Sequence, residues 1–322
     1  MLILEITLEE LDAPGFIKQQ VREIATTVGG GLAINALSGG VDSSVVTMLG
    51  HQALGKQLLT YFVDNGIMRE GEPERVAALF RQPGVPVEVL DAREEFFSAL
   101  RGLTDPEEKR EAVTQTFYKT VFGRLVRESG ARFLLQGTIF TDVEETIAGI
   151  KRQHNVLTQL GIDTKIMYGY TVLEPLLQLR KPAVREVARA LGLPKEIYNR
   201  PPFPGPALAT RIIGEVTPER VEIVRRATAI VEAELVGSDA FQYFAVLHLD
   251  RVTGIRDGKR DDYGLQIEVR CWDSTDAVTG TPTRLPYDVL DRLAERITTE
   301  VAGVVSVVYN ITKKPPSTIE AV

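Results

Sequence analysis

Cysteine and histidine are scarce in this chain of 322 residues, which has one cysteine, Cys271, and three histidines. A single cysteine excludes an internal disulfide and any zinc or iron–sulfur site built from cysteines of the same chain. Three histidines argue against a multi-histidine metal cage. We interpret Cys271 as a small core residue rather than a nucleophile, because unpaired cysteines are often buried.

The sequence also lacks long apolar runs and an excess of positive charge. No apolar run approaches the roughly 18 residues of a membrane-spanning helix, and the acidic start, MLILEITLEELDAPG, does not resemble a signal peptide. The net charge of −7 argues against a general nucleic-acid or membrane-surface binder. With 44% hydrophobic residues, the chain is expected to fold as one large or two ordinary domains and to be cytoplasmic.

The first two-thirds of the chain alternates short apolar segments with helical patterns. Segments 32–37, 58–63, 85–90 and 133–136 are predicted strands, and segments 43–54, 72–81 and 106–129 are predicted helices. Strands separated by helices indicate an α/β fold with a doubly wound parallel sheet. The loop after the first strand then lies at the carboxyl edge of the sheet, where ligands of such folds bind.

A proline-rich segment, RPPFPGP at 200–206, interrupts this pattern. Because neither a helix nor a central strand can continue through it, we predict one domain over 1–199 and a second over 200–322. Downstream, helices are expected at 218–236 and 286–301, and strands at 241–249, 265–271 and 304–311. The second domain is therefore predicted to be a smaller α+β domain.

The string SGGVDSS at 38–44 lies between the first predicted strand and the first predicted helix. Two adjacent glycines let the backbone approach a ligand closely, and the free N–H groups at a helix start favour an anion. An aspartate among such donors suits a phosphate site if Mg²⁺ bridges it to the phosphate oxygens. A capped turn would be the purely structural alternative. The string is neither a Walker A loop nor a GxGxxG fingerprint.

This string resembles the pyrophosphate loop of the N-type ATP pyrophosphatases. The resemblance implies an adenine nucleotide alpha hydrolase-like fold. It also implies that a substrate oxygen attacks the α-phosphate of ATP, releasing pyrophosphate, and that a nucleophile, commonly ammonia, then displaces AMP.

Further motifs are similar to those of GMP synthetase within that superfamily. They are FVDNG at 62–66, TDPEEKR at 104–110, QGT at 136–138, PFPGP at 202–206 followed by Arg211 and GEVT at 214–217, and KPPSTIE at 314–320. The resemblance runs from about residue 15 to the end with no glutaminase sequence before it, as in the separate synthetase subunit of archaea. It implies amination of XMP to GMP through an adenyl-XMP intermediate, with ATP as co-substrate and ammonia from a glutaminase partner. It further implies that the second domain forms a homodimer and helps to bind XMP.

The resemblance assigns roles to individual residues. It places Asp42 and Lys151 in catalysis, with Asp42 as the Mg²⁺ ligand and the Lys151 ammonium neutralising charge on the phosphates. The expected ATP and pyrophosphate ligands are Ser38, Gly39, Gly40, Val41, Asp42, Ser43, Ser44, Val63, Gly137, Thr138 and His154, and the expected XMP ligands are Arg211, Lys314, Ile319 and Glu320.

Several positions depart from the family pattern. The predicted lid reads QHNVLTQL at 153–160 where the family has HHNVGGLP, Asn310 replaces an acidic residue, and Ala321 and Val322 replace an acidic and an aromatic residue. CWDS at 271–274 replaces the usual A/V-V-E-S/T, and PALATR at 206–211 replaces PGLAVR. None of these changes touches the pyrophosphate loop, Lys151, Arg211 or Lys314.

Two other functions stay open on these grounds. A divergent paralogue could amidate or thiolate another purine-like substrate, or the chain could be a non-catalytic nucleotide-binding subunit. Other candidates are interpreted as structural: His51 and His248 as partly buried residues, and Glu144 and Glu145 as a helix surface rather than a Mg²⁺ site.

Overall fold

The computed structural model of this chain describes residues 3–147, 170–200, 203–256, 258–274 and 279–321. The chain folds into two compact units, which we describe separately. The first unit comprises Met1–Asp64, Glu72–Asp91 and Phe117–Arg200. The second unit comprises Asn65–Gly71, Ala92–Thr116 and Pro201–Val322.

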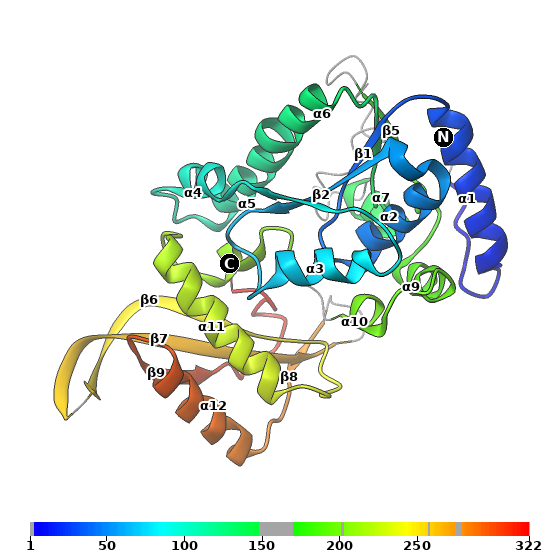
Figure 1. Cartoon of the computed structure of the whole chain (residues 1–322). Coiled ribbons are helices and arrows are strands. Elements are labelled where there is room, and N and C mark those ends of the chain that lie inside the picture. The colour runs from blue at the N-terminus through cyan, green and yellow to red at the C-terminus, as the bar shows by residue number, and fades with distance from the viewer. Residues whose placement is uncertain (1–2, 148–169, 201–202, 257, 275–278, 322) are drawn as a thin grey trace. The chain divides into compact units, whose positions relative to one another are not determined.

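The first unit contains a five-stranded parallel sheet with strand order β3-β2-β1-β4-β5 (Figure 1). The strands are β1 (Ala33–Ala36), β2 (Leu58–Asp64), β3 (Glu88–Asp91), β4 (Phe133–Leu135) and β5 (Thr171–Leu173). β1 is fully or largely buried, as expected for a central parallel strand. The order reverses between β1 and β4, so the prediction of a doubly wound α/β fold is confirmed. The strand β5 was not predicted.

Helices flank this sheet. They are α1 (Ala13–Val28), α2 (Val41–Leu54), α3 (Glu72–Arg81), α6 (Gly123–Ser129), α7 (Phe140–Ile147), α9 (Lys181–Ala190) and α10 (Lys195–Tyr198), with a 3₁₀ turn, η1, at Gly55–Gln57. α1, α2 and α9 pack on one another, and α2 contacts β1, β2 and β4. Helix α1 begins with Asp12 accepting a hydrogen bond from Gly15 N, followed by a proline in the first turn.

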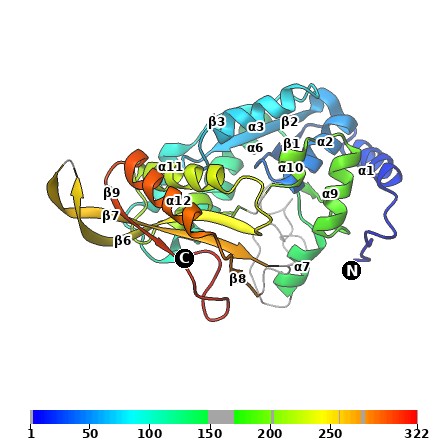
Figure 2. The same cartoon turned by 90° about the horizontal axis from the view of Figure 1, so that it is seen from below.

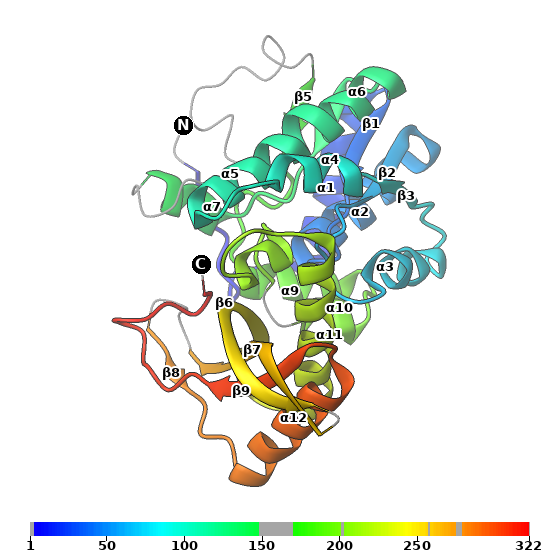
Figure 3. The ribbon, with the colours of Figure 1, turned by 90° about the vertical axis from the view of Figure 1, so that its left-hand side faces the viewer.

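The second unit is built on a mixed sheet formed by β6 (Gln242–Arg256), β7 (Lys259–Asp273), β8 (Thr281–Pro282) and β9 (Val304–Tyr309). β6 and β7 pair antiparallel as a long hairpin, and β9 runs parallel to β7 (Figure 3). Its helices are α4 (Arg93–Leu100), α5 (Pro106–Gln115), α11 (Pro218–Glu234) and α12 (Tyr287–Glu300), with a 3₁₀ turn, η3, at Ala207–Arg211. α11 packs on β6 and α12 on β9, with the two helices side by side (Figure 2). The prediction of a second α+β unit is confirmed.

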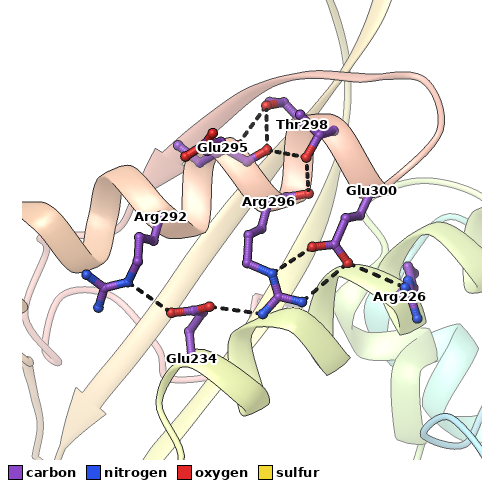
Figure 4. Close-up of polar contacts among 9 residues, drawn as sticks. Arg226, Glu234, Arg292, Glu295, Arg296, Thr298 and Glu300 are labelled. Atoms are coloured by element: carbon purple, nitrogen blue, oxygen red, sulfur yellow. Dashed lines mark hydrogen bonds and ion pairs between the residues drawn. The ribbon is translucent and has the colours of Figure 1, made fainter.

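Partly exposed ion pairs join α11 to α12 (Figure 4). Glu234 of α11 accepts from Arg292 Nε at 3.2 Å and from Arg296 Nη1 at 2.9 Å. Arg296 also contacts Glu300 at 2.6 Å within α12. Ion pairs near the surface contribute little individually, so the packing of α11 on β6 and of α12 on β9 matters more to the unit.

The second unit includes two segments from the amino-terminal half that the predicted division at 199/200 assigns to the first domain. Arg225 of α11 donates to Met68 O at 2.9 Å and to Gly66 O, and Gly102 N donates to Glu215 at 2.8 Å. These contacts between distant parts of the chain hold residues 65–71 and 92–116 in the second unit.

The predicted helical stretch at 106–129 forms three consecutive segments: α5, a π-helical turn η2 (Thr116–Phe122) and α6. Helix α5 begins as its sequence indicates. Asp105 Oδ1 accepts from Glu107 N at 2.9 Å and from Glu108 N at 3.0 Å, and Pro106 follows at the first helical position. Side-chain acceptance of free first-turn N–H groups is the main source of N-cap stability.

We expect Asp105→Ala to lower the free energy of unfolding by about 1 kcal/mol, because two first-turn N–H groups lose their acceptor. The measurement is equilibrium urea unfolding followed by circular dichroism. Asp105→Asn is the matched control, since its side-chain oxygen can still cap the helix. Equal losses in the two variants would contradict a capping role.

Candidate active site

The loop between β1 and α2 folds around the side chain of Ser43. Ser43 Oγ accepts a hydrogen bond from Ser38 N at 3.1 Å, lies 2.9 Å from Ser38 Oγ and donates to Gly40 O at 3.1 Å. Gly39 has φ +75°, a conformation that a side chain would strain. Gly40 is the N-cap residue of α2 and has no side chain that could bond the first-turn N–H groups. The loop therefore leaves a helix start open to an anion.

A buried polar chain fixes this loop to the sheet. Asn35 of β1 donates to Thr47 Oγ1 at 2.6 Å and accepts from Thr60 Oγ1 of β2 at 2.8 Å. Thr47 Oγ1 in turn donates to Ser43 O at 2.8 Å. Because these groups are buried, each hydrogen bond would be costly to break. The start of α2 is thereby held against β1 and β2.

Asp42, the expected Mg²⁺ ligand, lies in the first turn of α2. Its Oδ2 accepts from Lys181 Nζ at 2.5 Å, whereas its Oδ1 is buried and has no hydrogen-bond partner among the residues that the structure describes. An unpartnered carboxylate oxygen beside a phosphate loop fits Mg²⁺, which usually takes one or two carboxylates and completes its shell with phosphate oxygens and water. Within the described residues no cluster of three or more His, Cys, Asp or Glu offers an all-protein cage.

Lys181 and Arg200 are two basic residues at this loop that the motifs did not identify as site residues. Lys181 begins α9 and lies 139 positions after Asp42. Arg200 donates to Gly39 O at 3.1 Å and pairs with Glu72, whose side chain is 1% exposed. A residue-by-residue motif comparison misses both because their relation to the loop exists only in the folded chain.

Three further predicted ATP ligands lie at the carboxyl edge of the sheet. Val63 is the penultimate residue of β2, and Gly137 and Thr138 follow β4, the neighbour of β1. A Cβ at Gly137 would lie 3.2 Å from Asp42 Cβ and 3.3 Å from Ser43 N, so a larger residue would require these neighbours to move by a few tenths of an ångström. The fold thus brings together the predicted loop 38–44, Val63, Gly137 and Thr138. Lys151 and His154 lie outside the described residues.

The second unit contains a separate cationic site around Arg211, an expected XMP ligand. The Arg211 side chain is 1% exposed and lies over the Phe244 ring, 4.1 Å from its centroid, and near Phe203 at 5.0 Å. Its contacts to Glu320 are long, at 3.4 Å, and its Nη1 has no hydrogen-bond partner in the described part of the chain. Burial lowers the pKa of this guanidinium, and Glu320 opposes the shift.

Arg69 is a second buried arginine at this site and was not predicted from the motifs. Its guanidinium lies 4.1 Å from the centroid of the Phe203 ring, and its Nε donates to Glu232 at 2.7 Å. Two guanidinium groups over one aromatic ring, with an unused donor on Arg211, can bind a phosphate or carboxylate.

The carboxyl-terminal tail is docked rather than frayed. Ile319 packs in a buried cluster with Phe244, Val246 and Trp272. Glu320 accepts from Gln242 at 2.7 Å in addition to its contacts with Arg211. The structure therefore brings Arg211, Ile319 and Glu320 together, as the resemblance implies. For Lys314, the backbone pairs with Gly280 through two hydrogen bonds of 2.9 and 3.1 Å.

Lys109 contacts the backbone next to Arg211 and was not predicted as a functional residue. Its Nζ is buried and donates to Ile212 O, next to Arg211, at 2.8 Å. Burial lowers the pKa of this ammonium to about 8, the charge of Arg220 adds to the decrease, and Asp105 opposes it. A lysine with so low a pKa loses its proton at mildly alkaline pH.

The remaining candidates take structural positions. His51 is in the last turn of α2, and His248 Nε2 lies 2.8 Å from Glu268 Oε2. Cys271 is buried, and this burial raises the pKa of its thiol. Glu144 pairs with Arg180 at 2.7 Å, which agrees with a helix surface.

Both parts of the chain match known protein families. The NAD synthase family matches residues 12–205, and the GMP synthase C-terminal domain family matches residues 229–321. A glutamine-hydrolyzing GMP synthase subunit of Archaeoglobus fulgidus is 51% identical over 96% of this chain and 99% of its own length. The proteins of the same name from Pyrococcus horikoshii and Methanopyrus kandleri are 47% and 46% identical, each over 96% of this chain and 99% of their own.

The chain belongs to this family of GMP synthase subunits. The resemblance inferred from the motifs is confirmed, and so is the predicted class of enzyme, an ATP-dependent ligase of GMP synthase type. No helix in the described ranges is long and apolar enough to cross a membrane. The tail and linker positions at which this chain departs from the family pattern lie in a chain that matches each of these relatives over 96% of its length.

We expect Gly39→Ala to abolish most ATP-dependent turnover in this family member. A Cβ there would meet Val76 Cγ2 at 2.8 Å and Arg200 Nη1 at 2.9 Å, in addition to the strain of φ +75°. Gly84→Ala is the matched control, since Gly84 has φ +76° and open space around it. Both variants should lose about 1–2 kcal/mol to backbone strain, but only Gly39→Ala should lose ATP binding by calorimetry. Equal ATP affinities would contradict the role of this turn.

We expect Lys109→Met to remove a pH dependence of stability. The folded-state pKa of about 8 lies below the ordinary value of 10.5, so the unfolded chain holds more protons between these pH values. The wild-type contribution of Lys109 to the free energy of unfolding should therefore rise from pH 8 to pH 10. The measurement is urea unfolding of both proteins at several pH values. A constant difference between them would contradict the lowered pKa.

Proposed function

We propose that this chain aminates XMP to GMP, using ATP and releasing AMP and pyrophosphate through an adenyl-XMP intermediate. Membership of the GMP synthase family described above supports this reaction most strongly. The open helix start at 38–44 and the partly unsatisfied Arg211 site supply the anion-binding groups that two nucleotide substrates require.

In the first unit, the loop 38–44 would bind the β- and γ-phosphates, which leave as pyrophosphate. The N–H groups at the start of α2 and the hydroxyls of Ser38, Ser43 and Ser44 are the donors. Ser44 Oγ is buried and has no partner among the described residues, so it is free to donate. Val63 would contact adenine through its backbone, and Gly137 and Thr138 would line the nucleotide. Catalysis then depends on positioning and on charge stabilisation.

Asp42 would hold Mg²⁺ through its free Oδ1, and the ion would neutralise phosphate charge when bound. Lys181 pairs with the other oxygen of Asp42 and would add positive charge beside the phosphates. By resemblance, Lys151 and His154 would add positive charge and a hydrogen bond over the same phosphates.

In the second unit, Arg211 and Lys314 would bind the phosphate and ribose end of XMP, with Ile319 and Glu320 of the tail against the nucleoside. Because the contacts between Arg211 and Glu320 are long, the guanidinium and the carboxylate could each form a hydrogen bond with a substrate. Ammonia would come from a separate glutaminase subunit, as the name of the relatives suggests. We also propose homodimerisation through the domain at 200–322 and a cytoplasmic location.

The reaction is tested by pyrophosphate release from Mg·ATP with ammonium chloride, with and without XMP. Release that requires XMP, with GMP formed in equal amount, is expected. Arg211→Gln should raise the KM for XMP at least about tenfold, since a buried charged donor is lost, and leave the KM for ATP within about twofold. Arg251→Gln, which removes an exposed arginine of β6, is the control.

Other results would favour the alternatives. Pyrophosphate release with another purine nucleotide, but not with XMP, would indicate a divergent paralogue. ATP binding without turnover, even with ammonia and the glutaminase present, would indicate a non-catalytic nucleotide-binding protein.

A further inference from the structure

One face of the sheet in the second unit lies beneath the carboxyl-terminal tail. Alternate residues of β6 and β7 share this face because side chains alternate along a strand. Register pairs Gln242 with Trp272, Phe244 with Arg270, and Val246 with Glu268. We call this set of residues the tail face: Gln242, Phe244, Val246, His248, Glu268, Arg270 and Trp272.

A buried ion pair lies in the middle of the tail face. Arg270 Nε donates to Glu268 Oε1 at 2.7 Å, and both residues are buried. Burial alone would raise the pKa of Glu268, but the hydrogen bond from His248 and the charge of Arg270 lower it to about 2. Glu268 is therefore an anion throughout the physiological range, and it keeps Arg270 in one orientation.

The other end of the Arg270 guanidinium reaches the tail. Its Nη1 donates to Thr318 O and to Ile319 O, both at 3.0 Å. The next residue, Glu320, is the one that contacts Arg211 and Gln242. Arg270 thus holds the tail backbone immediately before Glu320, the carboxylate that contacts Arg211.

Asn310, which stands where the family pattern has an acidic residue, contacts the buried Glu268. Its Nδ2 donates to Glu268 Oε1 at 2.7 Å, on the oxygen that also accepts from Arg270. An aspartate at 310, the acidic type that the family has there, would place a second carboxylate against Glu268. Like charges this close in a buried site repel strongly, so the amide at 310 and the carboxylate at 268 are matched.

We propose that Arg270 is a positioning residue for XMP, because it orients the tail through the carbonyls of Thr318 and Ile319. Arg270 is itself oriented by Glu268 and Asn310, a matched pair in which one residue is a carboxylate and the other an amide. The inference rests on the proposed function, because it assumes that the tail binds XMP. It predicts that the carboxylate can be moved from 268 to 310 without loss of tail docking.

The single tryptophan of the chain reports on docking without any assay of activity. Trp272 is fully buried and packs against Ile319 in the cluster described above. If the tail leaves this face, the indole becomes exposed to water. Its emission then shifts to the red and it becomes accessible to acrylamide.

The test compares Asn310→Asp, Glu268→Ala and the double variant Glu268→Ala/Asn310→Asp with the wild type. Each single variant should shift Trp272 emission to the red and raise the KM for XMP by about tenfold, since a hydrogen bond to a charged group is lost. The KM for ATP should stay within about twofold. The double variant should recover most of the wild-type emission and KM, because one carboxylate again faces Arg270.

Asn199→Asp is the matched control, since it makes the same chemical change at an exposed position of the first unit. Arg270→Lys tests the role of Arg270 directly. A guanidinium donates to Glu268 and to the two tail carbonyls through different nitrogens, whereas a lysine has a single ammonium group. It should behave like the single variants. If Arg270→Lys fails to fold, the Asn310 and Glu268 series still decides the question.

Unchanged emission and unchanged XMP kinetics in Asn310→Asp and Glu268→Ala would overturn the proposal. Failure of the double variant to recover would overturn the matched pair. If the wild type lacks XMP-dependent turnover, the proposed function fails, whereas Trp272 emission still tests docking.

Discussion

The geometry of the turn between β1 and α2 is the constraint on which the first unit depends. The chain must leave a buried central strand, turn within the four residues 37–40 and begin a helix whose first N–H groups stay available. Gly39 makes the turn at φ +75°, and Ser43 bonds back to Ser38 and Gly40. The buried Asn35–Thr47 hydrogen bond keeps the helix start against the sheet. Flexibility at this point would disorder the helix start on which the candidate anion site depends.

Buried charge plays the corresponding part in the second unit. Arg211, Lys109, Arg270 and Glu268 are all buried, and each is costly to bury unless its hydrogen bonds are made. Glu268 and Arg270 satisfy one another and the tail carbonyls, whereas Arg211 retains an unpartnered Nη1 among the described residues. Glu268 and Arg270 therefore hold the tail, whereas Arg211 has a donor that no described residue uses.

Prediction from the sequence succeeded where the signal was contiguous. The order of strands and helices, the loop at 38–44 and the capped start of α5 each depend on residues within one short segment. It missed the short strands β5 and β8 and the helices α1, α4, α7, α9 and α10. The strands that it predicted for the β6–β7 hairpin were too short. The boundary at 199/200 came from a proline-rich segment, and composition alone gives no sign that 65–71 and 92–116 pack with the second unit.

The family and the α/β class can be predicted from the linear chain. The candidate phosphate loop can be predicted too, because the N–H groups, hydroxyls and carboxylate of residues 38–44 follow one another along it. The distant charges that contact this loop, and the arginine that contacts the tail, are found only in the folded protein. Lys181 is 139 positions from Asp42, Arg200 is 161 from Gly39, and Arg270 is 48 from Thr318. Electrostatic and hydrogen-bond partners are chosen by distance in space, which depends on the packing of the whole unit and not on any local pattern.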